Sequence, residues 1–199
     1  MKNICIFGAS SEKLEQHYYD TAYELGCELA KAGYGMVFGA GREGLMGAAA
    51  RGVKAQGGCI TGVIPVKLDQ PGVAFEHCDE LIRTQTMHER KSIMERLSAG
   101  FVALPGGFGT IEELMEVITL KQLGYHDCPI VILNENGFYD PLIKQFKTLV
   151  RQGFAHTRYL DLYHVAYTAK EAAAYFPAVI KEQPDSILNA AEVPLQESF

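Results

Sequence analysis

Residues 105–113, which read Pro-Gly-Gly-Phe-Gly-Thr-Ile-Glu-Glu, have the composition of an anion-binding turn. They follow a short apolar run and open into a segment with helical spacing of apolar residues, which predicts a strand-to-helix turn. The glycines at Gly106, Gly107 and Gly109 allow backbone conformations that a Cβ would forbid. The first N–H groups of the helix then face open space, where the helix dipole adds partial positive charge. Phosphate is the expected ligand of such a turn.

Thr110 and Glu113 follow these glycines and suit either ligand binding or helix capping. The Thr110 hydroxyl can add a donor to the anion site, and the Glu113 carboxylate would repel a phosphate but could reach an adjoining sugar. Ser/Thr-x-x-Glu is also the capping box, in which both side chains bind helix-end N–H groups and do no chemistry. The preceding Pro-Gly-Gly-x-Gly favours binding, because a plain cap needs no such run of glycines.

A second group of polar residues begins at Thr86 and ends in two adjacent cations. Thr86 and Glu89 form a capping box, which predicts the start of a helix. Arg90 and Lys91 then lie close to the positive end of that helix, where the dipole disfavours cations. A local rule broken in this way indicates function. For Lys91 a solvated helix face, with Glu89 and Glu95 as partners, is an equal alternative.

The elements that must position these residues alternate along the chain. Apolar runs predict strands at 3–7, 36–38, 59–64, 80–83, 100–104, 129–133 and 165–168. Helical spacing predicts helices at 18–32, 48–55, 86–97, 111–123, 141–150 and 169–180. Strands without polar alternation, separated by helices, indicate a parallel sheet covered on both faces. We therefore expect an α/β fold, a Rossmann-like three-layer sandwich with a parallel sheet flanked by helices.

Glycine-rich turns follow several of the predicted strands, at Gly8, Gly39 and Gly106. In a doubly wound sheet, ligands bind at the carboxyl ends of the strands. The turns should therefore converge on one crevice. The first turn, at residues 8–11, reads Gly-Ala-Ser-Ser, which is not a dinucleotide fingerprint, so NAD is not expected.

The length of 199 residues predicts a single domain, 1–199, with 183–199 as a peripheral tail. The net charge of −6 and the lack of a basic cluster argue against a nucleic-acid partner. No apolar run reaches the length of a membrane span, and residues 1–9 are too short for a signal peptide, so we expect no membrane association and a cytoplasmic location.

The cysteines and histidines give no sign of a metal site. The cysteines are scattered without a Cys-x-x-Cys pair, so we expect reduced thiols, mostly buried in strands and helices. They are Cys5, Cys27, Cys59, Cys78 and Cys128. His88 and Glu89 are not followed by the second histidine that a zinc-binding helix requires, so no metal is expected.

At this point the motifs resemble those of a known family. Residues 105–113 match the Pro-Gly-Gly-x-Gly-Thr-x-x-Glu signature of the Lonely Guy family, the cytokinin riboside 5'-monophosphate phosphoribohydrolases. Residues 87–91 look like its Met-His-x-Arg-Lys motif, and residues 44–47, Gly-Leu-Met-Gly, match a family turn. The resemblance extends from the first strand to the helix that ends near Phe154.

Two positions depart from the family pattern. Ala40 stands where a glycine is expected, and residues 65–68, Pro-Val-Lys-Leu, lack an acidic residue that many relatives carry soon after this proline. The second departure bears on the specificity for base or sugar.

The resemblance implies hydrolysis of the N-glycosidic bond of an N6-modified adenosine 5'-monophosphate, without a cofactor, by a homodimer. It makes Arg90 and Glu113 the catalytic pair and Lys91 a second positive charge for the phosphate. The chemistry agrees, because a carboxylate beside the ribose can stabilise the positive charge of the transition state or activate water. The implied phosphate-binding residues are Gly106, Gly107, Gly109 and Thr110, with Ser10 and Gly41 as further candidates.

Two alternatives remain open from the sequence. A general AMP nucleosidase would differ only in its tolerance of a bulky N6 substituent. A non-catalytic carrier of a nucleotide or phosphorylated cofactor would use the same turns, with Glu113 as a cap and Arg90 as a phosphate clamp. Lysine decarboxylation, a label that some relatives carry, is not favoured, because no lysine stands out as a Schiff-base former.

Overall fold

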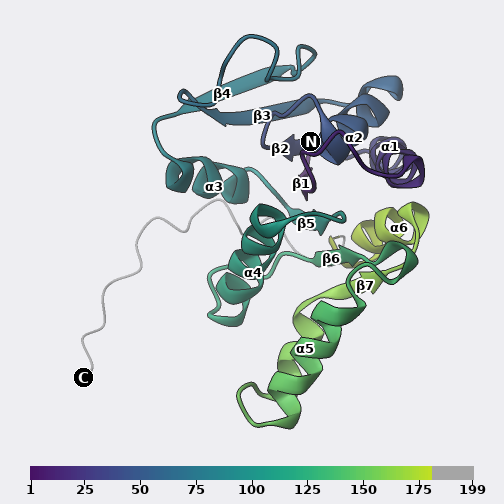
Figure 1. Cartoon of the computed structure of the whole chain (residues 1–199), viewed down its shortest axis with the longest axis vertical. Coiled ribbons are helices and arrows are strands. Elements are labelled where there is room, and N and C mark those ends of the chain that lie inside the picture. Colours follow the sequence, from purple (N-terminus) through teal and green to yellow (C-terminus); the bar gives the residue numbers. More distant parts are fainter. Residues whose placement is uncertain (181–199) are drawn as a thin grey trace.

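The computed structural model describes residues 1–180, and the predicted tail at 183–199 lies outside them. Within the described residues the strands form one parallel sheet in the order β4-β3-β2-β1-β5-β6-β7 (Figure 1). The strands are β1 (Asn3–Phe7), β2 (Gly35–Phe38), β3 (Ile60–Pro65), β4 (Glu80–Thr84), β5 (Gly100–Ala103), β6 (Ile130–Leu133) and β7 (His164–Ala166). The chain builds outward from β1 to β4 and then returns to β5 on the other side of β1, so the order reverses between β1 and β5.

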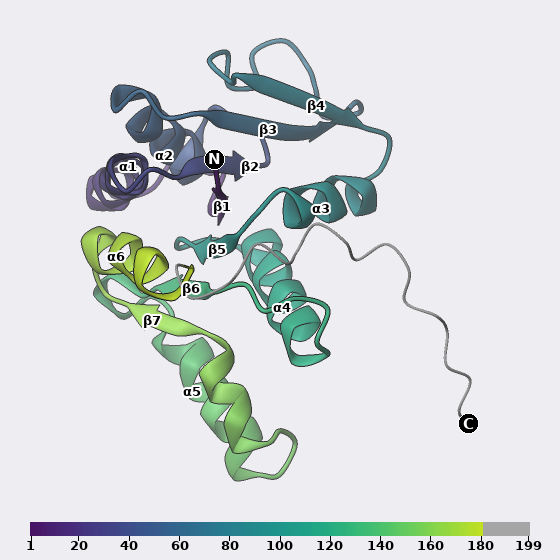
Figure 2. The same ribbon diagram turned by 180° about the vertical axis from the view of Figure 1, so that it is seen from behind.

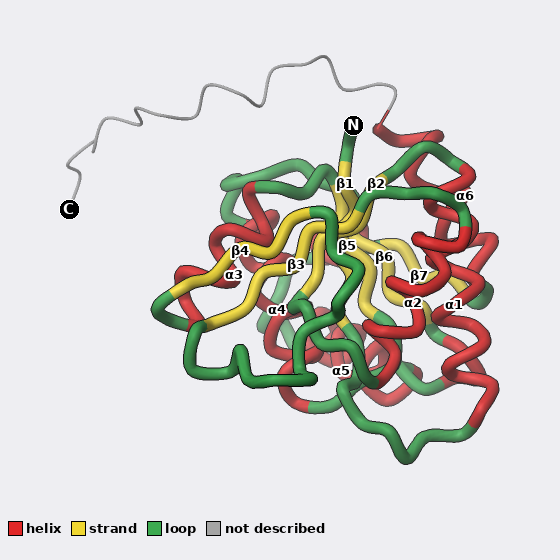
Figure 3. The backbone as a smooth tube through the Cα atoms, turned by 90° about the horizontal axis from the view of Figure 1, so that it is seen from above, coloured by secondary structure: helices red, strands yellow, loops and turns green. Residues whose placement is uncertain are grey.

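Helices cover both faces of the sheet, as the view from the opposite side and the view from above also show (Figures 2 and 3). On one face lie α1 (Gln16–Lys31), α2 (Gly44–Ala55) and α6 (Ala169–Ile180). On the other face lie α3 (Met87–Arg96), α4 (Phe108–Gln122) and α5 (Asp140–Arg151). Short 3-10 helices, η1 (Glu135–Gly137) and η2 (Thr157–Leu162), flank α5. The predicted three-layer α/β sandwich is confirmed.

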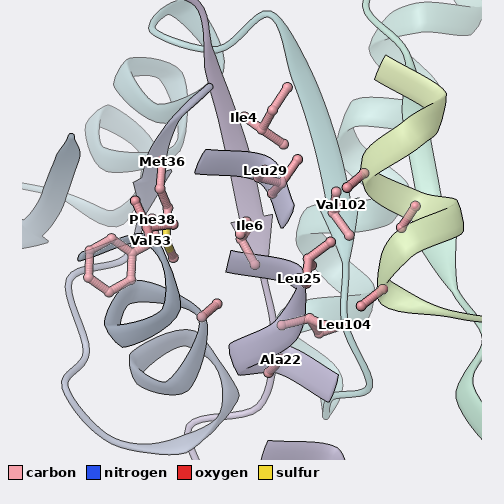
Figure 4. Packing of buried hydrophobic residues seen from close by; sticks show 14 of the residues in the cluster. Ile4, Ile6, Ala22, Leu25, Leu29, Met36, Phe38, Val53, Val102 and Leu104 are labelled. Atoms are coloured by element: carbon pink, nitrogen blue, oxygen red, sulfur yellow. The ribbon is translucent and has the colours of Figure 1, made fainter. Parts of the chain in front are cut away.

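The central strand β1 shows why both faces are covered. Ile4 and Ile6 point into the core beneath α1, α2 and α6 (Figure 4). Cys5 and Phe7 belong to the core beneath the other helices. Successive side chains of a strand alternate between faces, so an uninterrupted apolar run requires a helix layer on each side.

Small residues allow α1 and α2 to pack closely against each other. A Cβ added to Gly52 would lie 2.1 Å from the carbonyl oxygen of Tyr23, and one added to Gly26 would lie 2.0 Å from that of Ala49. Helices α1 and α2 therefore approach each other with backbone nearly in contact. The same contact explains why α2 is rich in glycine and alanine.

The cysteines are free thiols, as expected. Cys5, Cys27 and Cys128 are buried, whereas Cys78 is partly exposed and Cys59 is exposed. No helix in residues 1–180 has both the length and the apolar character needed to cross a membrane.

Candidate functional site

The predicted turns meet at the carboxyl ends of the strands. The backbone N–H of Ala9, after β1, donates to the carbonyl of Pro105, after β5, at 3.1 Å. The N–H of Leu45, in the first turn of α2, donates to the carbonyl of Ala9 at 2.8 Å. These bonds link the three turns directly and place them at the point where the strand order reverses, which is the usual ligand-binding position in such folds.

The glycine turn after β5 leads into α4 earlier than the sequence indicated. The helix begins at Phe108 rather than Ile111, with Gly107 as its N-cap and no described side chain capping this end. Ile111 makes the first backbone bond of the helix, to the Gly107 carbonyl at 3.0 Å. The N–H groups of the residues before it therefore have no partner of the usual helical kind.

The capping-box alternative for Thr110 and Glu113 is wrong, because both residues lie inside α4. Thr110 is buried, and a Cβ on Gly106 would lie 2.2 Å from its hydroxyl oxygen. Packing therefore explains Gly106. A Cβ on Gly107 or Gly109 would meet no described atom within 4 Å, so their lack of side chains leaves open space above the helix start.

Arg90 and Glu113 form a buried ion pair beside this turn. The Arg90 Nη1 donates to Glu113 Oε1 at 3.0 Å, and the two side chains are only 9% and 11% exposed. Arg90 Nε also donates to the Val63 carbonyl of β3 at 3.2 Å. The guanidinium lies against Gly39, where a Cβ would be 1.9 Å from Nη2. The pair is thus held between α3, α4 and the ends of β2 and β3.

The electrostatics of Glu113 suit a reacting carboxylate. Burial raises the pKa of Glu113, and the nearby Arg90 guanidinium offsets only part of that rise. A carboxylate whose pKa is moved toward neutrality, and whose charge remains paired, can accept a proton more readily than an exposed one. Such perturbed groups cluster at functional sites.

Lys91 makes its own ion pairs with carboxylates of α4 other than Glu113. Its ammonium group contacts Glu112, and Glu116 at 2.8 Å, and the three side chains form an outer cluster on α3 and α4. The alternative of a solvated helix face holds only in that Lys91 pairs with carboxylates: its side chain is 16% exposed, and its partners are Glu112 and Glu116 rather than Glu89 and Glu95. Glu89 instead completes the predicted capping box, accepting from the Gln85 N–H at 2.8 Å. A role for Lys91 in binding phosphate stays a prediction.

The two weaker candidates lie in the other turns of the same edge. Ser10 is exposed and packs by its backbone against Gly44, where a Cβ would lie 2.7 Å away. Gly41 forms an isolated bridge with Ala74, which ties the second turn to the segment between β3 and β4. Within residues 1–180 no group of three or more His, Cys, Asp and Glu side chains could hold a metal ion.

Comparison with known proteins places the chain in a family. A family model described as "possible lysine decarboxylase" matches residues 46–176. The cytokinin riboside 5'-monophosphate phosphoribohydrolase LOG of Oryza sativa subsp. japonica is 41% identical over 97% of this chain and 80% of its own length. LOG4 of Arabidopsis thaliana, which carries the same enzyme name, is 42% identical over 84% of this chain and 78% of its own. The chain belongs to the family of these phosphoribohydrolases.

Solved structures support the fold assignment. The molybdenum cofactor carrier protein of Chlamydomonas reinhardtii superimposes with a TM-score of 0.70 at 25% identity, covering 92% of this chain and all of that one. The molybdenum cofactor binding protein of Rippkaea orientalis gives a TM-score of 0.69 at 19% identity, over 90% of this chain and 98% of that one. This chain and the cofactor carriers therefore share one architecture.

Two parts of the site escaped the sequence reasoning. The sequence indicated Gly39 only as a turn residue, whereas in the structure its lack of a side chain makes room for the Arg90 guanidinium. A glycine directly after a strand was the available signal. The Val63 carbonyl, which accepts from Arg90, had no signal at all because a backbone acceptor leaves no trace in residue type.

Proposed function

We propose that this protein hydrolyses the N-glycosidic bond of N6-modified adenosine 5'-monophosphates, releasing the free base and ribose 5-phosphate. The observation that carries the proposal is the buried Arg90–Glu113 pair beside an open, glycine-rich helix start. Family membership supports it, because the relatives named above are cytokinin riboside 5'-monophosphate phosphoribohydrolases.

In this proposal the phosphate end of the substrate binds the uncapped start of α4. Gly107 and Gly109 leave space there, and the N–H groups with the helix dipole favour a dianion. Thr110, Ser10 and Gly41 belong to the same predicted phosphate site. The ribose then extends toward Glu113, which lies on the same helix.

The reaction breaks the bond between C1' of the ribose and the base nitrogen while water adds to C1'. Positive charge grows on the ribose ring, and the Glu113 carboxylate stabilises it or takes the proton of the attacking water. One water proton ends on the departing base. Arg90 is a fixed cation that keeps Glu113 oriented and can donate to the phosphate or to the base.

The decisive experiment is release of free base, measured by chromatography, from AMP, isopentenyladenosine 5'-monophosphate and the two unphosphorylated nucleosides. We expect the isopentenyl monophosphate to be the best substrate. Equal or faster turnover of AMP would make the protein a general AMP nucleosidase. No release from any compound by folded protein would overturn the hydrolase proposal.

Cofactor carriage is the second candidate, and the likeness to the Chlamydomonas molybdenum cofactor carrier protein favours it. The substitution Glu113→Gln separates the two, with Glu112→Gln on the adjacent, outer position as the matched control. A hydrolase loses turnover in the first variant only and retains nucleotide binding. A carrier binds its ligand equally well in both variants.

A homodimer in the cytoplasm completes the proposal. Apolar side chains from α4, α5 and η2 line a shallow hollow that a second copy could cover. They include Met115, Phe146, Leu149, Leu160 and Tyr163. Sedimentation of the purified protein tests this, and a monomer at micromolar concentration would contradict it.

A further inference from the structure

The glycine turn is held from behind by a tyrosine that the proposed reaction does not use. Tyr139, the residue before α5, is only 1% exposed, and its hydroxyl donates to the Leu104 carbonyl at 2.7 Å. Leu104 comes directly before the Pro-Gly-Gly turn and is itself fully buried, with its side chain in the opposite core (Figure 4). The tyrosine therefore reaches across the end of β5 to the first peptide of the turn.

Tyr139 is anchored at its backbone as well. Its N–H donates to Oδ1 of Asn134 at 2.7 Å, and Asn134 Nδ2 donates to Asp140 Oδ1 at 2.8 Å. The N–H of Asn134 in turn donates to the Ala166 carbonyl of β7 at 2.8 Å. Because Asn134 is fully buried at the end of β6, these bonds fix the tyrosine to the rigid sheet.

The peptide groups before Gly106 are consequently both constrained. Tyr139 holds the Leu104 carbonyl, and the Ala9 N–H holds the Pro105 carbonyl at 3.1 Å. In a trans peptide the N–H points opposite to the carbonyl, so fixing the Pro105 oxygen also fixes the direction of the Gly106 N–H. Neither carbonyl is free to rotate toward an anion, which its oxygen would repel.

We propose that Tyr139 is a positioning residue for the 5'-phosphate: its hydroxyl fixes the turn so that backbone N–H groups, and not carbonyls, face the ligand. The inference rests on the phosphate-binding part of the proposed function. A hydroxyl with a merely structural role would alter stability and leave the discrimination between phosphorylated and unphosphorylated ligands unchanged.

The test is Tyr139→Phe, which keeps the ring and removes only the hydroxyl. Tyr34→Phe is the matched control, because Tyr34 is also buried, at 8% exposed, but packs against Phe176 directly before β2, at the opposite end of the strands from the turn. Binding of ribose 5-phosphate is measured by calorimetry, at a temperature where melting curves show both variants folded. We expect about tenfold weaker binding in Tyr139→Phe, as loss of one buried hydrogen bond implies, and no change in Tyr34→Phe.

A second readout uses turnover of a monophosphate and of its unphosphorylated nucleoside. In Tyr139→Phe the KM for the monophosphate should rise about tenfold, while kcat and the activity on the nucleoside stay constant. Unchanged ribose 5-phosphate affinity, or equal weakening in both variants, would overturn the inference. If wild type binds ribose 5-phosphate but releases no base, the hydrolase proposal fails while the effect of Tyr139 on binding still decides this one.

Discussion

Two ion pairs connect the same helices through adjacent residues, and they differ in almost every physical respect. Arg90 and Glu113 are buried, and Arg90 is also bonded to a strand carbonyl and packed on a glycine. Lys91 follows Arg90 on α3, Glu112 precedes Glu113 on α4, and the Glu112 side chain is 56% exposed. Consecutive helical residues point about 100° apart, so one step in sequence separates an inner pair from an outer one.

The comparison shows that residue type alone does not determine whether a charged side chain is suited to chemistry. The inner pair is shielded from water, so its electrostatic interactions are strong and its geometry is fixed. In the outer cluster Glu112 is 56% exposed while Lys91 and Glu116 are 16% and 27% exposed, so the Lys91–Glu112 pair is open to solvent at its carboxylate end and contributes less. The predictions below test whether chemistry belongs to the inner pair only.

Exchanging the cations should produce the largest contrast. Arg90→Lys removes the planar fork that binds both Glu113 and Val63, and we expect turnover to fall by roughly 100-fold or more. Lys91→Arg preserves the outer charge and should change turnover by less than about threefold. Steady-state kinetics on the best monophosphate measures both. Similar losses in the two variants would remove the distinction between the pairs.

Displacing the inner arginine without altering its charge should have the next largest effect. The Cβ in Gly39→Ala would lie 1.9 Å from Arg90 Nη2, so the guanidinium must move, and we expect roughly 10- to 100-fold lower turnover. A double-mutant cycle with Arg90→Ala isolates the cause. Once Arg90 is absent, adding Gly39→Ala should cost little more; an additive loss would show that Gly39 acts elsewhere.

Glu95, which lies on α3 near Glu116 of the outer cluster, should make the stability depend on pH. Burial, followed by repulsion from Glu116, raises the pKa of Glu95 to about 7. A carboxyl with a raised folded-state pKa stabilises the protein fully below its unfolded-state pKa, and that contribution is lost as pH rises through about 7. Glu95→Gln should therefore be more stable than wild type at pH 8, by about 1 kcal/mol after allowing for solvent screening.

Urea denaturation at about pH 4 and pH 8 measures this difference. From the lower to the higher pH, the free energy of unfolding should decrease more for the wild type than for Glu95→Gln. Because the Glu95 carboxyl is protonated in both states at the lower pH, the two proteins should have similar stability there. If the free energy of unfolding changed equally with pH in both proteins, the Glu95 carboxyl would not be the group responsible.

Removing the outer cation should have the smallest effect. Lys91→Gln is expected to lower the free energy of unfolding by about 0.5 kcal/mol, and that loss should shrink at about 1 M salt because the Glu112 carboxylate, which is 56% exposed, is screened. Unfolding curves at low and high salt measure it. In turnover assays, a higher KM for the monophosphate alone would instead support the predicted phosphate contact of Lys91.

Periodicity and glycine placement predicted nearly all of the fold. The strands and helices lie where apolar patterns placed them, and β1 and α6 agree to the residue. The helix starts were less accurate: α2 begins at Gly44 and α4 at Phe108, because glycines and an exposed aromatic residue disguise a helical turn. The capping alternative for Thr110, which the run of glycines already disfavoured, depended on the late start predicted for α4.

The sequence predicted the residues of the candidate site that belong to the two motifs. It did not predict contacts that depend on tertiary packing. The spacing of the motifs identified Arg90 and Glu113, and the resemblance paired them. The pairing of Lys91 with Glu112 and Glu116 depends on how α3 packs beside α4, and Tyr139 comes from beyond β6. Neither contact leaves a local pattern in the chain.

The sheet order has a consequence for synthesis on the ribosome. Strand β1 emerges first, yet one of its edges waits for β5, since Ile4 pairs beside Gly100. Until then the nascent chain exposes an apolar strand edge, and such edges invite pairing with other chains. The last support of the glycine turn, Tyr139, arrives later still. A nascent chain stalled before β5 would need chaperone protection and would have no assembled active site.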